Sequence, residues 1–175
     1  MKKIIPIIFL FLIVFVIYIF NVDKRIKYLY IGNTVYSDFN KLIKEHHNPK
    51  QYIEYIRDDD YRVMDLINKI KDNDTINNKK MQNLLIKSNV IVINIGLYDV
   101  EYKKQLDYKY VDELLDDIEK LLIIIRKYNK DKIYFLGFNN KNKYYTYLNS
   151  KLELICKSKK ITYINIEKPI INQLY

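Results

Sequence analysis

Three short apolar runs of the chain each end at a glycine, and they contain all three of its glycines. The runs are YLYIG (28–32), VINIG (92–96) and YFLG (134–137). A run of Tyr, Ile, Val and Leu with little polar alternation is typical of a strand buried on both faces, as in a parallel sheet. ITYINI (161–166) has the same character, and QYIEYI (51–56) is a weaker candidate. The sequence therefore predicts a parallel sheet of about five strands.

Apolar residues at helical spacing fill the gaps between these runs. The clearest set recurs over 111–125, with acidic residues early and Arg126 and Lys127 late, as the helix dipole favours. Weaker sets predict helices near 39–43, 63–70, 81–85 and 145–155. Strands that alternate with helices predict an α/β fold, a doubly wound three-layer α/β/α sandwich with helices on both faces of the sheet. We expect the flavodoxin-like strand order 2-1-3-4-5, built from 26–31, 52–56, 90–95, 132–136 and 161–165.

The N-terminal segment 1–23 differs from the rest of the chain. Two lysines precede an apolar run from Ile4 to Phe20, which as a helix would span roughly 25 Å, at the short end for a bilayer crossing. No Ala or Gly lies near Phe20, which favours an uncleaved signal anchor over a cleaved signal peptide. Lys2 and Lys3 precede the run, and Lys24, Arg25 and Lys27 follow it, so positive charge flanks both sides. The very short N-terminal tail favours a single-pass membrane protein with domain 24–175 outside the cytoplasm.

The formal net charge of +9 has two explanations, an anionic partner or the codon bias of an AT-rich genome. The lysines occur as pairs scattered along the chain (79–80, 103–104 and 159–160), whereas an electrostatic footprint needs clustering. We therefore expect no nucleic-acid partner, and weak, salt-sensitive binding of residues 24–175 to DNA or anionic vesicles. The single cysteine, Cys156, excludes an intramolecular disulfide and falls at an apolar helical position, which predicts a buried thiol.

The ends of the strands carry short motifs, which read Gly32-Asn33-Thr34, Gly96-Leu97-Tyr98-Asp99 and Gly137-Phe138-Asn139-Asn140. In the order and spacing of these motifs, residues 26–166 resemble the SGNH/GDSL hydrolases. The resemblance implies a three-layer sandwich around a five-stranded parallel sheet. It also implies a serine nucleophile in a Gly-Asp-Ser motif after the first strand, an oxyanion asparagine in a Gly-x-Asn-Asp motif after the third, and an Asp-x-x-His pair near the C-terminus.

Carried over residue by residue, the resemblance places Thr34 at the nucleophile and Tyr98 at the oxyanion asparagine. A deletion before YSDF (36–39) is an alternative, in which case Thr34 matches no family residue. Ser37 is a poor substitute for the nucleophile, because its position before a predicted helix indicates an N-cap. The long loop expected over 97–109 is of a kind that is often functional. Thr34 is thus the candidate catalytic residue, and the candidate cleft and oxyanion residues, expected at the carboxyl ends of the strands, are Gly32, Asn33, Gly96, Tyr98 and Asp99.

A hydroxyl nucleophile needs a base, and the sequence offers none in the family's order. The only histidines are His46 and His47, and no Asp-x-x-His follows before Tyr175. We therefore expect Asp99 to accept backbone N–H bonds in the turn after its strand. Asp58-Asp59-Asp60 lacks the spaced ligands and the turn glycine of a calcium loop, so neither metal nor cofactor is expected.

The sequence thus predicts a membrane-anchored SGNH-hydrolase-like domain that is catalytically degenerate, with no turnover of short-chain aryl esters. One alternative is an esterase or acyl-transfer enzyme with a rearranged site. Another is a membrane-tethered binding or scaffold domain whose ligand is a small-molecule ester or a glycan. A truncated reading frame is the last alternative, and no protein partner is indicated.

Overall fold

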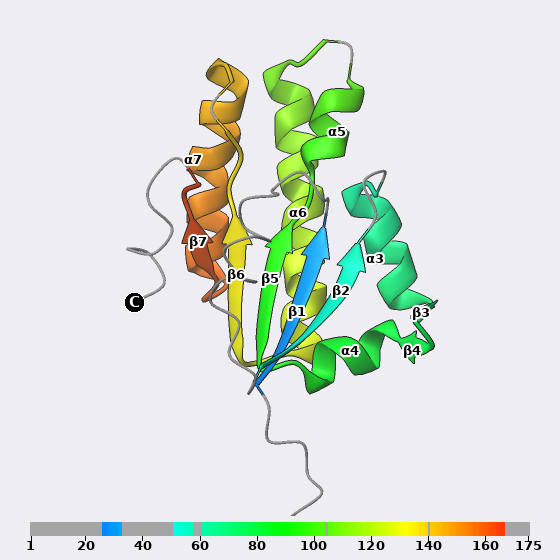
Figure 1. The fold of residues 1–175 in the computed structure, drawn as a ribbon. Helices are drawn as coiled ribbons and strands as arrows, with labels where there is room; N and C mark the ends of the chain where they lie inside the picture. Colours follow the sequence, from blue (N-terminus) through cyan, green and yellow to red (C-terminus); the bar gives the residue numbers. More distant parts are fainter. Residues whose placement is uncertain (1–25, 33–50, 58–60, 104, 140, 167–175) are drawn as a thin grey trace, which may run out of the picture.

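A computed structural model describes residues 26–32, 51–57, 61–103, 105–139 and 141–166 (Figure 1). Its main sheet has five strands in the order β2-β1-β5-β6-β7, and every neighbouring pair is parallel. This is the predicted 2-1-3-4-5 order, so the prediction for the sheet is confirmed. The strands are β1 (Ile26–Gly32), β2 (Gln51–Arg57), β5 (Val90–Asn94), β6 (Lys132–Leu136) and β7 (Thr162–Ile164).

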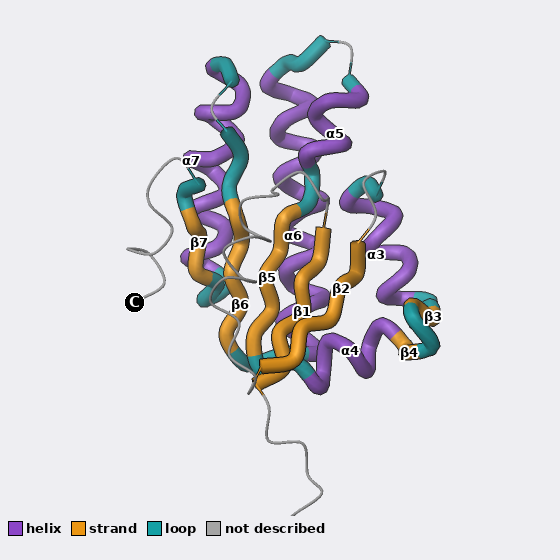
Figure 2. The backbone as a smooth tube through the Cα atoms, viewed as in Figure 1, coloured by secondary structure: helices purple, strands orange, loops and turns teal. Residues whose placement is uncertain are grey.

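The helices follow the strands as the apolar spacing predicted, and Figure 2 shows how they alternate with the sheet. The predicted helix near 39–43 lies outside the described residues. The prediction of a loop over 97–109 is wrong for the first half of that range, because Leu97–Tyr102 form a short helix. A two-stranded antiparallel hairpin of β3 (Thr75–Ile76) and β4 (Lys79–Lys80) was not foreseen. The helices are α3 (Val63–Lys71), α4 (Met81–Lys87), α5 (Leu97–Tyr102), α6 (Tyr108–Tyr128) and α7 (Lys143–Ser158).

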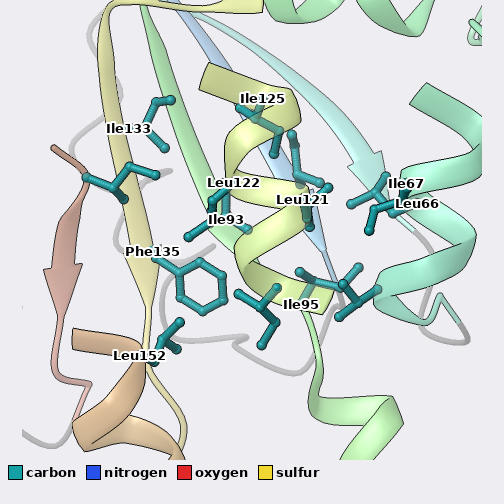
Figure 3. Packing of buried hydrophobic residues seen from close by; sticks show 14 of the residues in the cluster. Leu66, Ile67, Ile93, Ile95, Leu121, Leu122, Ile125, Ile133, Phe135 and Leu152 are labelled. Carbon is teal, nitrogen blue, oxygen red and sulfur yellow. The ribbon is translucent and has the colours of Figure 1, made fainter. Parts of the chain in front are cut away.

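The sheet is buried on both faces, which explains why its strands show little polar alternation in the sequence. On one face Ile93 and Phe135 pack with Leu121 and Leu122 of α6 in a core that also takes in α3, α4, α5 and α7 (Figure 3). The opposite face forms a smaller cluster of buried residues around Val92. The helices of the described ranges contribute to the first core, so the second helical layer of the predicted sandwich stays a prediction.

Polar residues mark the ends of the two long helices. The carboxylate of Asp107 accepts the Tyr110 N–H at the start of α6, and the Asn142 side chain accepts the N–H groups of Tyr144 and Tyr145 at the start of α7, as N-caps do. The amide of Asn129, just after α6, donates to buried backbone carbonyls. Both helices run back along the parallel strands and therefore end near the edge of the sheet where the strands begin (Figure 1).

No helix within the described ranges is long and apolar enough to span a bilayer. The apolar segment 4–20 lies outside those ranges, so the predicted signal anchor stays a prediction.

Candidate functional site

The predicted site residues that the structure describes lie at the carboxyl ends of neighbouring strands. Gly32 ends β1 and is the register partner of Asn94, which ends β5. Gly96 is the N-cap of α5, the helix that carries Tyr98 and Asp99. The other two predicted residues, Asn33 and Thr34, lie outside the described residues, so the nucleophile assignment stays a prediction.

Contacts between neighbouring strand ends account for the glycines. A Cβ atom on Gly32 would lie 1.6 Å from the carbonyl oxygen of Asn94, and Gly32 has a φ of +142°. Gly96 has a φ of +107°, and a Cβ atom there would lie 3.3 Å from Cζ of Phe138. A Cβ atom on Gly137 would lie 2.1 Å from the hydroxyl of Tyr163. Packing of the sheet edge thus explains these positions without a ligand.

The carboxylate of Asp99 contacts the start of helix α3. Its Oδ2 accepts the backbone N–H of Val63, the first residue of α3, at 3.2 Å. The backbone oxygen of Asp99 accepts the hydroxyl of Tyr110 at 2.8 Å. Asp99 accepts its own backbone N–H, as expected for the turn, and the bond to Val63 adds an unforeseen partner 36 residues back in the chain. The carboxylate supplies an acceptor that the N-cap Arg62 lacks, because a guanidinium only donates.

Burial raises the pKa of Asp99 to about 6. The side chain is 8% exposed, so the charged form loses most of its hydration. Hydrogen bonds from the backbone N–H groups of Val63 and of Asp99 itself, and the charge of Arg62, limit the rise in pKa. Such a carboxyl group is a candidate acid–base group by its titration range, and its Oδ2 accepts the N–H of the first residue of α3.

Tyr98 packs within a small aromatic group. Its ring centroid lies 5.7 Å from that of Tyr102. The guanidinium of Arg62 lies 4.1 Å from the Tyr102 centroid and 5.9 Å from the Tyr98 centroid. These contacts hold Tyr98 beside the start of α3 by cation–π attraction.

Asp99→Asn is expected to stabilise the protein at neutral pH and to have little effect near pH 3.5. Because the folded pKa is raised, the folded state keeps a proton that the unfolded chain loses between about pH 4 and 6, so stability falls as pH rises through that range. The amide keeps an acceptor for Val63 and removes the buried charge, which should give about 1–2 kcal/mol at pH 7.5. Urea unfolding of the full chain in mild detergent at both pH values measures the difference.

Asp65→Asn is the matched control for this prediction. The Asp65 carboxylate is exposed and accepts the N–H of Arg62 at the same helix end, at 3.2 Å. Removal of its charge should not stabilise the protein at neutral pH, because an exposed carboxylate favours a helix N-terminus. An equal gain for Asp99→Asn at both pH values would contradict the argument from burial.

Asn94 is a polar residue of this site that the sequence interpretation missed. Its side chain is 1% exposed, and neither its nitrogen nor its oxygen has a hydrogen-bond partner within the described part of the chain. The amide of Asn129 is also buried, but it donates to the carbonyls of Leu85 and Ser88 at 2.7 Å each and accepts the Asp131 N–H at 2.8 Å. An unpaired buried amide is costly. Asn94 therefore stands out as a group that a ligand would satisfy.

Burial limits the chemistry of the single cysteine. Burial raises the pKa of Cys156 to about 12, and its thiol is buried as predicted, so it is not a nucleophile at neutral pH. The described ranges hold no group of three or more His, Cys, Asp or Glu side chains placed to bind a metal ion.

Comparison with known proteins gives similarity of fold. No family model matches the chain, and no curated protein matches it. The structure is similar to the crystal structure of the acetyl xylan esterase AlAXEase, with a TM-score of 0.56 and 11% identity over 79% of this chain and 77% of that one. It is also similar to the N-terminal part of the protein BF1531 from Bacteroides fragilis, which contains a phosphatase domain complexed with Mg. That match has a TM-score of 0.55 and 13% identity over 82% of this chain and 41% of that one.

At these identities the similarity establishes the fold class. The chain is an α/β domain with a five-stranded parallel sheet, and its fold resembles that of an esterase. This agrees with the fold implied by the resemblance to SGNH/GDSL hydrolases. It transfers neither a substrate nor a catalytic residue, because one fold supports many functions.

Proposed function

We propose that the chain is a membrane-anchored SGNH-hydrolase-like domain that does not hydrolyse esters. The observation that carries the proposal is the use of the Gly96–Asp99 segment. Asp99 binds the start of α3, and Tyr98 packs against Tyr102 and Arg62. In the Gly-x-Asn-Asp motif of the hydrolases that this segment resembles, Tyr98 stands at the oxyanion asparagine and Asp99 at the aspartate that follows it. Here both side chains have structural contacts in place of catalytic ones.

The chemistry of ester hydrolysis supports the same proposal. A threonine hydroxyl at position 34 would need a base to take its proton. The two histidines precede the third strand in the chain, whereas the family's base follows the last strand. Asp99 is the carboxylate at this end with a raised pKa, and its Oδ2 is bound to a backbone N–H. The contact with α3 gives the Asp99 carboxylate a structural role at this position.

The anchor is the second part of the proposal. The apolar run from Ile4 to Phe20 has the length and composition of a membrane-spanning helix. We place residues 1–23 in the anchor and residues 24–175 in one domain on the extracytoplasmic side, as the short N-terminal tail favours.

A binding function is the second candidate, and Asn94 favours it. Its buried amide offers one acceptor and two donors next to the end of β1. A small ester or glycan has hydroxyl and carbonyl groups that match such an amide. On this candidate the carboxyl ends of the strands bind a ligand without turning it over.

The full chain in mild detergent is expected to hydrolyse p-nitrophenyl acetate at the rate of buffer and detergent alone. Thr34→Ala and Ser37→Ala should give that same background rate, because the sequence offers no base in the order of the resembled family. The release of p-nitrophenol at neutral pH measures the rate. Hydrolysis well above background that disappears in Thr34→Ala, and persists in Ser37→Ala, would overturn the non-catalytic proposal and assign Thr34 as the nucleophile.

A further inference from the structure

Basic side chains gather at the edge of the sheet opposite the candidate site. A hollow of about 1130 Å³ lies at the amino ends of β1, β5, β6 and β7, and its lining includes Arg126, Lys130, Lys132, Lys159 and Lys160. A second hollow, of about 490 Å³, lies beside it, and its lining includes Lys27, Lys79, Lys80 and Lys87. Tyr28 lines both hollows. We call this surface the amino-end face.

Internal contacts account for some of these cations. Arg126 donates to the backbone carbonyls of Asp131, at 2.7 Å, and of Lys159 and Lys160. The Nζ of Lys159 lies 2.7 Å from the carboxylate of Glu119. These residues lie at the ends of α6 and α7, where a cation is also favoured by the helix dipole.

Other cations of the amino-end face are exposed and have no carboxylate partner within the described ranges. Lys132 begins β6, and Lys160 lies in the turn before β7 with a φ of +57°. Lys132 is outside any helix, so the helix dipole does not explain its charge, whereas Lys160 lies just past the end of α7. The carboxylates that line the two hollows are Asp131 and Glu54, and Glu54 is already paired with Lys79. Unpaired positive charge therefore dominates the face.

The course of the chain places this face next to the proposed anchor. The apolar run ends at Phe20, and β1 begins at Ile26, which itself lines the larger hollow. The intervening residues 21–25 can span at most roughly 20 Å when fully extended. They include Lys24 and Arg25, so the tether itself is positively charged. A bilayer that holds residues 4–20 would therefore lie close to the amino-end face, with the carboxyl ends of the strands pointing away from it.

We infer that the amino-end face docks on the anionic phospholipid headgroups of the membrane that holds the anchor. The inference rests on the anchor in the proposed function. Attraction to an anionic surface fades within a Debye length, about 8 Å at physiological salt. A free domain gains little from it, whereas a short tether keeps the face at high effective concentration near the lipid. The domain then stands with its candidate site toward the aqueous phase, so the ligand of that site is a soluble molecule and not a lipid ester.

The test uses the full chain in nanodiscs of phosphatidylcholine, with and without about one third phosphatidylglycerol. Amine-reactive labelling followed by mass spectrometry measures the rate at each lysine. Lys132 and Lys160 should react at least about threefold more slowly in the anionic discs, and 1 M salt should abolish the difference. Lys109 and Lys143, near the starts of α6 and α7 at the opposite end, are the internal controls and should react equally in both discs.

Paired variants test the same surface by charge removal. Lys130 lines the same hollow and should also react more slowly in anionic discs. Lys132→Gln with Lys160→Gln should abolish that difference, whereas Lys109→Gln with Lys143→Gln should leave it unchanged. Equal rates at Lys132 and Lys160 in the two discs would overturn the inference. Stronger protection of the same lysines by an added oligonucleotide than by phosphatidylglycerol would also overturn the inference, because the face would then be a nucleic-acid surface.

Alkaline extraction from neutral phosphatidylcholine vesicles tests the anchor separately from the amino-end face. A chain that is washed out contradicts the anchor, independently of lipid charge. The amino-end face is then tested by flotation of the full chain with phosphatidylglycerol vesicles at low salt. Flotation that is lost in the Lys132→Gln, Lys160→Gln variant supports the face as an anionic-lipid surface, and no flotation overturns it.

Discussion

Gly32→Ala is expected to lower the free energy of unfolding at 25 °C by about 4 kcal/mol or more. The new Cβ would lie 1.6 Å from the carbonyl oxygen of Asn94 and 2.4 Å from its carbonyl carbon. These are backbone atoms of β5, and β1 is held between β5 and β2, so relief of the clash requires two ladders to shift. The φ of +142° adds strain for any L side chain. Overpacking and strain together should cost about 4 kcal/mol or more, a large part of the 5–15 kcal/mol that is typical of a native protein.

Gly137→Ala is the matched control at the end of the adjacent ladder. Its Cβ would meet the hydroxyl of Tyr163 at 2.1 Å, but a hydroxyl at the end of a side chain can move. We expect a loss of about 1–2 kcal/mol. Circular dichroism during thermal unfolding in mild detergent compares the two variants. A Gly32→Ala protein with a wild-type melting temperature would contradict the packing argument and would leave close approach of a ligand as the reason for the glycine.

The fold could be predicted from the sequence because its signals are local. A strand buried on both faces leaves an unbroken apolar run, as in β1 and β5, and α6 leaves apolar positions at helical spacing over several turns. Each run ends at a glycine, and at Gly32 the backbone of the neighbouring strand leaves no room for a Cβ atom. The six residues of α5 are too few to show a period, so a loop was predicted there.

The candidate site could be predicted only in part, because its contacts are distant in the sequence. Asp99 and Val63 are 36 residues apart, and no local pattern around Asp99 indicates a helix end as its partner. Asn94 follows four strongly apolar residues, so it was taken for one more strand residue. Its unpaired amide becomes evident only when its neighbours in space are known.

The distribution of charge was also hidden by the chain order. The pairs 79–80 and 159–160 are far apart in the sequence, but both line hollows at the amino ends of the strands. In a parallel α/β sheet every crossover returns the chain to that edge. Lysines at the ends of several helices therefore gather on one face. Codon bias can supply the lysines, but the topology decides where they lie, and this is why the amino-end face needs an experiment of its own.

Two buried asparagines are expected to respond in opposite ways to replacement by valine. Asn94→Val removes an amide that has no hydrogen-bond partner among the described residues, and it places a strand-favouring side chain on the face that Val92 shares. We expect a gain of about 1–2 kcal/mol, because the cost of an unsatisfied buried group is relieved. Asn129→Val removes the donors for the carbonyls of Leu85 and Ser88. That loss should cost about 3 kcal/mol.

The backbone does not confound the comparison, because Asn129 has an extended conformation, with φ of −130° and ψ of 127°, that valine readily adopts. For a protein of this size the melting temperature should rise by about 2–8 °C for Asn94→Val and fall by about 6–12 °C for Asn129→Val. Thermal unfolding of both variants in the same detergent measures the contrast. If Asn94→Val is destabilised as much as Asn129→Val, then the Asn94 amide already has a partner within the fold. The case for a ligand at the carboxyl ends of the strands would then lose its support, whereas a stabilised variant would mark Asn94 as a group kept at the expense of stability, as binding groups often are.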